Sequence, residues 1–408
     1  MKVLNISSDR NIFKEGSVVR ARMIEYGTLF EELHIIVFCP KKLSTFPPAL
    51  IHRQADSFQL STNVRVYPTN SCSKWLYIFD AIRIGKRIIR NWKSARTNVH
   101  SDGLKIENSR NDLVISSQDP FECGLAAYQL SKLAKLSLHI QIHTDFLSPY
   151  FASLSLLNRL RVLIARHILP KANAVRVVSQ RIKNSLEICN LPVATEPTVL
   201  PIFANLEKFK IAEPVFSLQE KYSHWGFIIL AVARLSPEKN IAFAIKILQE
   251  ILKTYPKTGL VIVGDGSLGE SLKFKVKSLK LDENVAFEGW QENTVSYYKT
   301  ANLFLQTSLY EGFGLSLLEA LASGCPAVSS DVGIAPEILN HKGHSFVCPV
   351  NDLACFVSTI SQLIEDNQLR IFFSTQIAPA AVLPFVQSKE YYLRAYKMSL
   401  ENYRANIR

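Results

Sequence analysis

The sequence predicts an α/β protein made of two doubly wound, Rossmann-like domains that face each other across a cleft. The chain has 408 residues, and single cores stop growing at about 250–300 residues, so two domains are expected. Short β-branched runs alternate twice along the chain with longer amphipathic segments, which is typical of parallel sheets covered by helices. Two such domains in tandem place a ligand crevice between the carboxyl ends of their strands.

We expect an N-terminal domain over residues 1–205, a C-terminal domain over 206–380 and a C-terminal helical segment over 381–408. The strands predicted in the first domain are Val3–Ile6, His34–Cys39, Asn63–Tyr67, Asp112–Ser116, Leu138–Ile142, Ala174–Val178 and Thr198–Pro201, with helices at Val18–Phe30, Glu122–Lys135 and Ser155–Leu169. Those predicted in the second are Gly226–Val232, Leu260–Val263, Val285–Phe287 and Leu303–Gln306, with helices at Ile241–Leu252, Leu268–Leu279 and Leu315–Ala322.

The charge is distributed unevenly between the two halves. The net charge is +12, of which residues 1–210 contribute +13 and the remainder −1. This asymmetry predicts a polyanionic partner for the first half: nucleic acid, an anionic membrane surface or a phosphorylated substrate. No apolar run reaches the 18–20 residues or so that span a bilayer, and Met1–Ile6 is too short for a secretory signal.

The seven cysteines include no C-x-x-C pair and are odd in number. This pattern predicts reduced thiols in a cytosolic compartment, and neither a disulfide framework nor a zinc site. We therefore expect a cytoplasmic protein. If it contacts the membrane, we expect it to be a peripheral protein on the inner face.

The densest chemical signal is the segment from Tyr310 to Glu319, Tyr-Glu-Gly-Phe-Gly-Leu-Ser-Leu-Leu-Glu. Its glycines let the backbone approach a ligand, and the turn opens into a helix whose free N–H groups suit a phosphate. The carboxylates of Glu311 and Glu319 suit sugar hydroxyls, since a carboxylate accepts two hydrogen bonds. The alternative is a capping box formed by Ser316 and Glu319.

A second signal follows the predicted strand Gly226–Val232. Ser236 is placed as an N-cap with Pro237 at the first helical position, so Arg234 and Lys239 stand at the mouth of the crevice. Two cations there can neutralise a departing diphosphate without a metal. The alternative is an Arg and a Lys on a solvated loop.

These segments resemble the retaining family 4 glycosyltransferases (glycosyl transferases group 1), which have the GT-B fold. The carboxylate pair of that family, with seven residues between, is matched by Glu311 and Glu319, and its Arg-Leu-x-x-Glu-Lys segment by Arg234–Lys239. The similarity is strong from about Gly226 to Glu337. In the first half, Gly16 resembles the family's glycine loop and His143 its active-site histidine.

The resemblance implies retaining transfer of a sugar from a nucleotide-diphosphate donor in the C-terminal domain to an acceptor in the N-terminal domain. The acceptor class it implies is a glycan or a lipid-linked molecule of envelope or surface polysaccharide and glycolipid synthesis. The catalytic residues that it implies are His143, Arg234, Lys239 and Glu311. The donor-binding residues that it implies are Gly16, Arg234, Lys239, Gly264, Glu311, Gly312, Phe313, Gly314, Leu315 and Glu319.

We expect no metal and no cofactor. The chain has no D-x-D sequence, so the usual carboxylate pair for a metal on the diphosphate is missing. Arg234, Lys239 and helix N-termini take the metal's electrostatic role. The resemblance also implies that the C-terminal segment, with Tyr391, Tyr392, Leu393 and Tyr396 in a helical pattern, packs back across the first domain.

Two alternatives belong to other classes of protein. The triplet Gly264-x-Gly266-x-x-Gly269 follows a predicted strand and opens a helix, as in an NAD(P)-dependent oxidoreductase. This triplet follows the second strand of its domain, whereas the dinucleotide fingerprint normally follows the first. The other alternative is a non-catalytic scaffold that binds a membrane or polyanion.

The basic stretch after Trp75 carries Arg83, Lys86, Arg87 and Arg90, interleaved with isoleucines and Trp92. Aromatic and aliphatic residues beside a cationic face are typical of an interfacial helix that docks on an anionic membrane or on the acceptor. The alternative is a solvated face over buried isoleucines. Nucleic acid is not expected as a partner, because no element that reads bases is recognisable.

Overall fold

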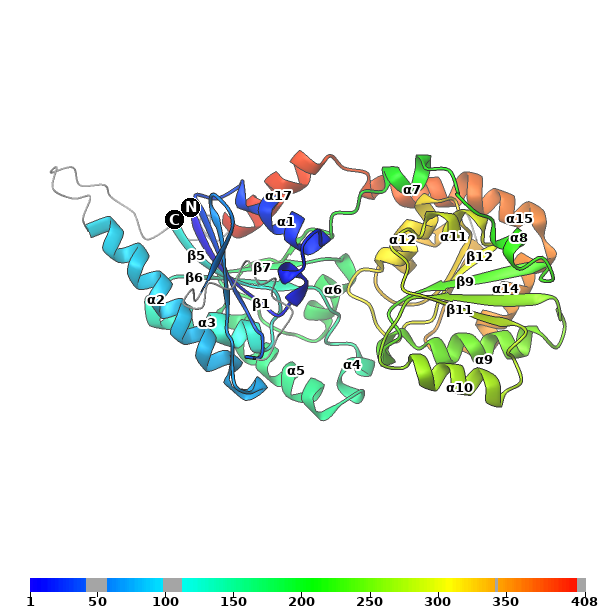
Figure 1. The fold of residues 1–408 in the computed structure, drawn as a ribbon, viewed down its shortest axis with the longest axis horizontal. Coiled ribbons are helices and arrows are strands. Elements are labelled where there is room, and N and C mark those ends of the chain that lie inside the picture. Colours follow the sequence, from blue (N-terminus) through cyan, green and yellow to red (C-terminus); the bar gives the residue numbers. More distant parts are fainter. Residues whose placement is uncertain (42–56, 98–111, 342–343, 402–408) are drawn as a thin grey trace.

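The two domains predicted from the sequence are present, and the fold class is confirmed (Figure 1). The computed structural model describes residues 1–41, 57–97, 112–341 and 344–401. Each domain is a central, mainly parallel sheet with helices packed on it, and the two lie side by side. The first and last described residues both belong to the N-terminal domain.

The N-terminal domain contains an eight-stranded sheet of order β3-β4-β2-β1-β5-β6-β7-β8, parallel except at β3. Its strands are β1 (Lys2–Ser7), β2 (Glu32–Val37), β3 (Phe58–Ser61), β4 (Val64–Pro68), β5 (Leu113–Ser117), β6 (Ser137–Ile142), β7 (Ala174–Val177) and β8 (Thr198–Val199). Its helices are α1 (Val18–Gly27), α2 (Tyr77–Thr97), α3 (Glu122–Ala134), α4 (Pro149–Ser153), α5 (Leu156–Ile168) and α6 (Gln180–Ile188).

The C-terminal domain has a parallel six-stranded sheet of order β11-β10-β9-β12-β13-β16. Its strands are β9 (Phe227–Val232), β10 (Thr258–Val263), β11 (Val285–Gly289), β12 (Leu303–Gln306), β13 (Ala327–Ser330) and β16 (Val347–Cys348). Its helices are α7 (Glu207–Ile211), α8 (Leu218–Lys221), α9 (Ile241–Ile251), α10 (Gly269–Ser278), α11 (Val295–Thr300), α12 (Leu315–Ala322), α13 (Ala335–Ile338), α14 (Leu353–Glu365), α15 (Asn367–Phe372) and α16 (Ala378–Val382).

Local sequence explains where these elements begin. The strands are continuous apolar runs because helices cover both faces of a parallel sheet, and all six residues of β10 are buried. Ser17, Ser155 and Ser179 each precede a helix, and their hydroxyls accept hydrogen bonds from its free N–H groups. These serines set the residue at which each helix begins.

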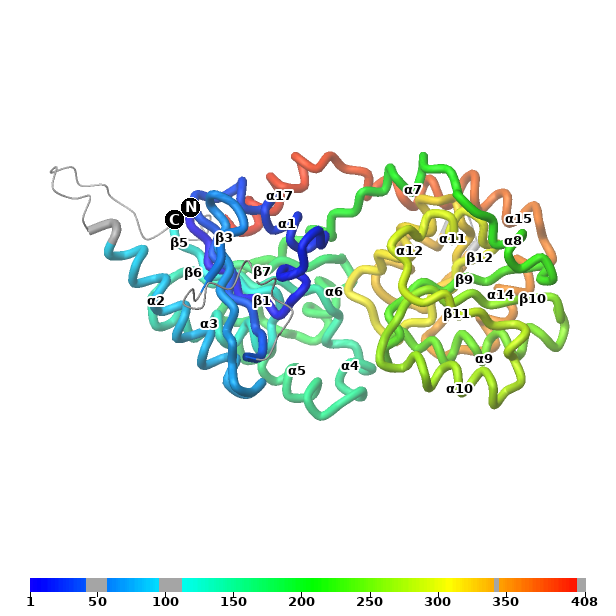
Figure 2. Tube along the Cα trace, viewed as in Figure 1, coloured from blue at the N-terminus to red at the C-terminus, as the bar shows by residue number. Residues whose placement is uncertain are grey.

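The chain crosses back to its first domain at the end. Helix α17 (Lys389–Glu401) lies against the N-terminal domain (Figure 2). Buried Tyr392 accepts a hydrogen bond from Arg176 Nη2 (2.9 Å) and shares another with the hydroxyl of Tyr26 (3.0 Å). Tyr396 stacks on the ring of Tyr26. Helix α17 packs against the N-terminal domain because its tyrosines Tyr392 and Tyr396 are buried there.

Strand β8 is shorter than the predicted run Thr198–Pro201. The carbonyl of Leu200 accepts hydrogen bonds from the buried guanidinium of Arg176, and the carbonyl of Pro201 accepts another. The strand therefore ends at Val199, and the next two carbonyls accept hydrogen bonds from Arg176.

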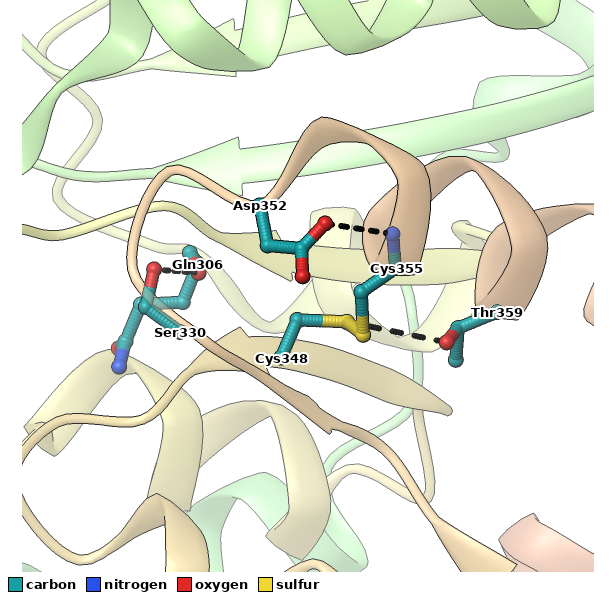
Figure 3. Close-up of a disulfide and its surroundings, with 6 residues drawn as sticks. All are labelled: Gln306, Ser330, Cys348, Asp352, Cys355 and Thr359. Carbon is teal, nitrogen blue, oxygen red and sulfur yellow. Dashed lines mark hydrogen bonds between the residues drawn. A yellow bond between two sulfur atoms is a disulfide. The ribbon is translucent and has the colours of Figure 1, made fainter.

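The prediction that all the cysteines are reduced is wrong. Cys348 at the end of β16 and Cys355 in the first turn of α14 form a disulfide, with Cα atoms 5.7 Å apart (Figure 3). Asp352 caps α14 by accepting a hydrogen bond from the backbone N–H of Cys355 (3.0 Å), which turns the chain back on itself. The spacing of the cysteines in the sequence did not indicate this disulfide. The two thiols come together because the chain turns tightly between β16 and α14. The other five cysteines are free.

The described residues contain neither a cluster of metal ligands nor a single membrane-spanning helix. Among the described residues no group of three or more His, Cys, Asp or Glu side chains is placed to hold a metal ion. Within the same residues no single helix is long and apolar enough to cross a bilayer, while one pair bent by 49°, Asn367–Phe385 with Lys389–Glu401, passes on length and composition.

We predict that thiol titration of the denatured protein without reductant finds five reactive cysteines, and seven after reduction, because Cys348 and Cys355 are joined. The double variant Cys348→Ser/Cys355→Ser should give five under both conditions. Seven thiols before reduction would contradict the disulfide.

Candidate active site

The glycine turn between β12 and α12 runs from Gly312, which lines the cleft, to Gly314, which precedes the helix. Gly314 is the N-cap of α12, and Leu315 is its first residue. The capping-box interpretation of Ser316 and Glu319 is wrong, because Ser316 already lies inside the helix and no side chain caps its N-terminus. The free backbone N–H groups of the first turn are therefore open to an anion.

Glu319 lies one turn further along α12 and is mostly buried. Its carboxylate accepts a hydrogen bond from the hydroxyl of Tyr298 (3.1 Å), a fully buried residue of α11. Burial raises the pKa of Glu319, and the hydrogen bond from Tyr298 opposes that effect. A buried carboxylate with one protein partner keeps acceptor capacity for hydroxyl groups of a ligand.

Two cations and a carboxylate meet at the carboxyl ends of β9 and β12. Lys239 Nζ lies 2.5 Å from Glu311 Oε1, which also accepts a hydrogen bond from the hydroxyl of Ser308 (2.7 Å). Arg234 is exposed and forms no ion pair with another described residue. The pair of cations predicted from the sequence is therefore brought together, with Arg234 free and Lys239 held by Glu311.

The loop that carries Arg234 depends on glycines in the next loop. An added Cβ at Gly264, where φ is +133°, would lie 1.9 Å from the carbonyl oxygen of Ala233, and one at Gly266 would lie 2.4 Å from that of Leu235. Backbone bonds from Leu235 N to Asp265 O (2.9 Å) and from Leu268 N to Leu235 O (3.0 Å) join the two loops.

This packing explains the dinucleotide-like glycine triplet. Gly264 and Gly266 admit the neighbouring protein backbone, so the close approach that a pyrophosphate would need is already filled by residues 233–235. The triplet thus holds the loop that carries Arg234 in position. It no longer favours the oxidoreductase alternative.

His143 and Gly312 mark the place where the two domains touch. An added Cβ at Gly312 would lie 1.9 Å from the carbonyl oxygen of His143, so only glycine fits there. The hydroxyl of Ser179 donates to the carbonyl of Gly312 (2.8 Å), and the rings of Phe151 and Tyr310 meet edge to face across the cleft. Burial lowers the pKa of His143 to about 3, with smaller contributions from nearby arginines.

A cavity of about 530 Å³ lies between the domains. Its lining includes five of the predicted site residues, His143, Arg234, Lys239, Glu311 and Gly312. Arg161 and Tyr310 also line it, and the sequence reasoning gave neither a place in the cleft. Arg161 lies on α5, and only the fold shows that the start of this helix lies at the cleft.

The structure does not bring all the predicted donor-binding residues to this cavity. Gly16 lies in the turn before α1 and Gly264 at the end of β10, both outside the residues that line the cleft. Phe313 is buried against Phe385. Gly314, Leu315 and Glu319, at the start of α12 and within it, are also outside the residues that line this cavity.

The basic stretch forms helix α2, and the structure separates its two faces. Ile84, Ile88, Ile89 and Trp92 are buried in the core, while Arg83, Lys86, Arg87 and Arg90 are exposed. The expectation that these isoleucines and Trp92 enter a membrane is wrong, because they pack against the sheet and α3. The solvated face over buried isoleucines is the arrangement present.

Known proteins are similar to this chain in sequence, most clearly in its C-terminal domain. Residues 220–376 match the family model described as glycosyl transferases group 1. The chain is 28% identical over 194 residues to the UDP-Gal:alpha-D-GlcNAc-diphosphoundecaprenol alpha-1,3-galactosyltransferase of Escherichia coli, covering 45% of this chain and 50% of that one. It is 29% identical over 240 residues to the alpha-monoglucosyldiacylglycerol synthase of Streptococcus pneumoniae, covering 56% and 54%. The chain thus spans about half the length of these relatives.

Solved structures match over nearly the whole chain. Anabaena HepE in complex with UDP and glucose gives a TM-score of 0.70 at 19% identity, covering 98% of this chain and 100% of that one. Sucrose-phosphate synthase from Thermosynechococcus elongatus gives 0.73 at 17% identity, covering 99% and 100%. The fold is the GT-B architecture. The region that matches the glycosyl transferases group 1 family, residues 220–376, lies in the C-terminal domain.

We predict that His143 stays neutral from pH 5 to 8, because a group with pKa near 3 is deprotonated throughout that range. The pH dependence of kcat/KM, which reports ionisations of the free enzyme, should keep the same shape in His143→Gln even if the rate falls. A wild-type ionisation near pH 6.5 that disappears in the variant would contradict this assignment.

Proposed function

We propose that this chain is a retaining, metal-independent glycosyltransferase that uses a nucleotide-diphosphate sugar as donor. The observation that carries the proposal is the free Arg234 beside the Lys239–Glu311 pair, in a cleft that Gly312, in the turn before α12, also lines. In the reaction the anomeric C–O bond to the diphosphate breaks, a bond to the acceptor hydroxyl oxygen forms, and the hydroxyl proton passes to the leaving phosphate.

The donor diphosphate fits the positive side of this site. Arg234 and Lys239 attract the charge that develops on the leaving diphosphate, and the amides before and at the start of α12 add the positive end of a helix dipole. Glu311, held by Lys239 and Ser308, offers its remaining lone pairs to hydroxyls of the transferred sugar. Glu319, one turn further along α12 and outside the lining of this cavity, is proposed to bind the ribose.

Retention of anomeric configuration and the identity of the donor rest on similarity. The similar structure of Anabaena HepE is a complex with UDP and glucose, and the relatives include a galactosyltransferase and an alpha-monoglucosyldiacylglycerol synthase. UDP-glucose and UDP-galactose are therefore the first donors to screen by thermal shift, since a ligand that binds only the native state raises its melting temperature. NMR of the product decides retention.

We predict that Arg234→Ala abolishes transfer by removing one preorganised electrostatic group, worth about 3–4 kcal/mol of barrier. Glu319→Ala should also abolish it, chiefly by weakening donor binding. Lys246→Ala, an exposed change on α9, serves as the matched control and should behave like the wild type. If both site variants turn over donor at the wild-type rate, the site assignment is wrong.

We predict that activity persists in excess chelator, because Arg234, Lys239 and the α12 amides supply the positive charge that a metal would bring to the diphosphate. The measurement is donor turnover before and after dialysis against a chelator. Complete loss that magnesium or manganese restores would overturn the electrostatic assignment.

We further propose that the enzyme meets a glycan or lipid-linked acceptor at an anionic membrane surface, and that α5 does the docking. Leu156, Leu160 and Leu163 follow one another at helical spacing and are 79%, 48% and 64% exposed. The helix carries three arginines and no acidic residue, which suits an anionic leaflet. Its first turn lines the cleft, so docking would bring the acceptor to the donor.

We predict that wild-type protein sediments with vesicles containing anionic lipid, and that Leu156→Gln/Leu160→Gln/Leu163→Gln reduces this strongly without loss of donor hydrolysis. Reversal of Arg83, Lys86, Arg87 and Arg90 to Glu on α2 should weaken it further through charge alone and reduce its salt sensitivity. Phe274→Gln, an exposed apolar residue of α10, is the control. Failure of the wild type to sediment at low salt would exclude the membrane as partner.

A further inference from the structure

The disulfide between Cys348 and Cys355 lies at the same edge of the C-terminal sheet as the donor site. Cys348 at the end of β16 pairs with Ser330 of β13, and β13 pairs with β12, which precedes Glu311. These strands are parallel, so their carboxyl ends meet at one edge, where ligands of open α/β sheets bind. The donor site proposed above gives the disulfide no role.

The turn closed by the disulfide contacts the loop that carries Lys239. Asn351 lies in this turn, and its Oδ1 accepts a hydrogen bond from Nδ2 of Asn240 (2.8 Å). Asn240 directly follows Lys239, and the carbonyls of both residues accept hydrogen bonds from the hydroxyl of Thr307 (3.1 and 3.2 Å). The place of Lys239 therefore depends in part on where the turn holds Asn351.

The same turn also borders the segment that carries the carboxylate of the donor site. Pro349 and Val350 line a cavity of about 420 Å³ together with Tyr310. Tyr310 also lines the donor cleft, and the next residue is Glu311. The turn thus adjoins the segments that carry both partners of the Lys239–Glu311 pair.

Strand β16, on the other side of the disulfide, is weakly held. It has two residues and forms the edge of its sheet, and elements with few contacts open at a low free energy. Helix α14, by contrast, is anchored by the buried side chains of Phe356, Ile360 and Leu363. The bond between Cys348 and Cys355 joins this strand to the well-packed helix, so breaking it frees the turn to move relative to α14.

We propose that this disulfide is a redox-sensitive site that sets the affinity for the nucleotide donor through the contact between Asn351 and Asn240. The affinity is high when the disulfide is formed and lower when a dithiol has reduced it. The inference rests on the glycosyltransferase activity proposed above, because it acts on the loop of Lys239. In a reducing compartment, such as the cytoplasm expected for this chain, disulfides are usually transient and catalytic or redox-sensing.

The sulfur that a reductant can reach is that of Cys355. Cys348 is 0% exposed, whereas Cys355 is partly exposed. A thiolate of the dithiol attacks Cys355 Sγ, which forms a mixed disulfide and releases Cys348 as a thiolate that takes up a proton. The hydroxyl of Thr359 lies 3.7 Å from Cys348 Sγ, beside this leaving sulfur (Figure 3).

The second thiol of the reductant then displaces Cys355, which also takes up a proton. The protein disulfide has gained two electrons and two protons, and the dithiol has become a disulfide. The bond between Cys348 and Cys355 forms again when a disulfide oxidant runs the same exchange in reverse.

The test compares nucleotide binding by the full chain in its two redox states. The Kd of UDP, or of GDP if the donor screen selects a guanosine donor, is measured by calorimetry after oxidation with diamide and after excess dithiothreitol. We expect the Kd to rise at least threefold on reduction. Equal Kd values in the two states, or failure of Cys348 and Cys355 to form a disulfide on oxidation, would overturn the inference.

The double variant Cys348→Ser/Cys355→Ser is the first control, since it keeps the other five cysteines. It should bind the nucleotide with the Kd of the reduced wild type under both conditions. A response to dithiothreitol as large as that of the wild type would overturn the inference, because the effect would then come from another cysteine.

A second variant tests the contact itself and leaves the disulfide in place. Asn351→Gly removes the bond to Asn240 but allows the backbone to keep its φ of +66°. The oxidised variant should bind at least threefold more weakly than the oxidised wild type, and reduction should change its Kd less than twofold. Asn190→Gly, an exposed asparagine with φ of +48° after α6, is the matched control and should behave like the wild type. A wild-type Kd and response in Asn351→Gly would overturn the inference.

The oxidised wild type separates this inference from the proposed function. Binding of the nucleotide with the same Kd in both redox states refutes the redox inference and leaves the donor site standing. Absence of UDP and GDP binding in both states refutes the donor site itself, and the redox inference with it.

Discussion

The structure depends on a contact between two backbones, where Gly312 of the C-terminal domain meets the carbonyl of His143 in the N-terminal domain. A side chain at position 312 would collide with that carbonyl at 1.9 Å, so the approach of the two domains at this point requires glycine. The hydrogen bond from Ser179 to the Gly312 carbonyl fixes the same turn from the other side. Everything that faces the cleft is placed relative to this contact: Arg234 and Lys239 on one wall, His143 on the other.

A second close contact between backbones positions the loop that carries Arg234. The loop with Arg234 is held by the backbone of residues 264–268, which only glycines at 264 and 266 allow to come so close. Rigid placement matters because electrostatic stabilisation of a leaving group works through charges that need no rearrangement when the reaction occurs. In the N-terminal domain, Tyr392 and Tyr396 of α17 contact the buried guanidinium of Arg176, so this helix holds that side chain in place.

Much of the fold was predictable, because it depends on local patterns. The runs of buried β-branched residues identified the inner strands except β13, and β12 and α12 have the bounds expected from sequence. The pair Arg234 and Lys239 was found because a strand end, an N-cap and a proline fix their position locally. Edge strand β3 and the short β16 were missed, since partly exposed or two-residue strands carry little hydrophobic pattern.

The remaining features depend on contacts between distant residues. The disulfide of Cys348 and Cys355 follows from a turn, and Arg161 reaches the cleft only because α5 packs there. The amphipathic pattern of α2 was real, but whether its apolar face meets a membrane or the core is decided by α3, which packs against it. The glycine triplet is the clearest case, because the same spacing serves a ligand in one fold and a neighbouring loop in this one.

The most direct test of the account is a crystal structure of the chain with a bound nucleoside diphosphate. We predict that the diphosphate lies between Arg234, Lys239 and the amides of Gly312–Leu315, with the ribose at Glu319. A diphosphate bound instead at the Gly264–Gly269 loop, with Arg234 and Lys239 turned away from it, would contradict the assignment of this cleft as a sugar-donor site.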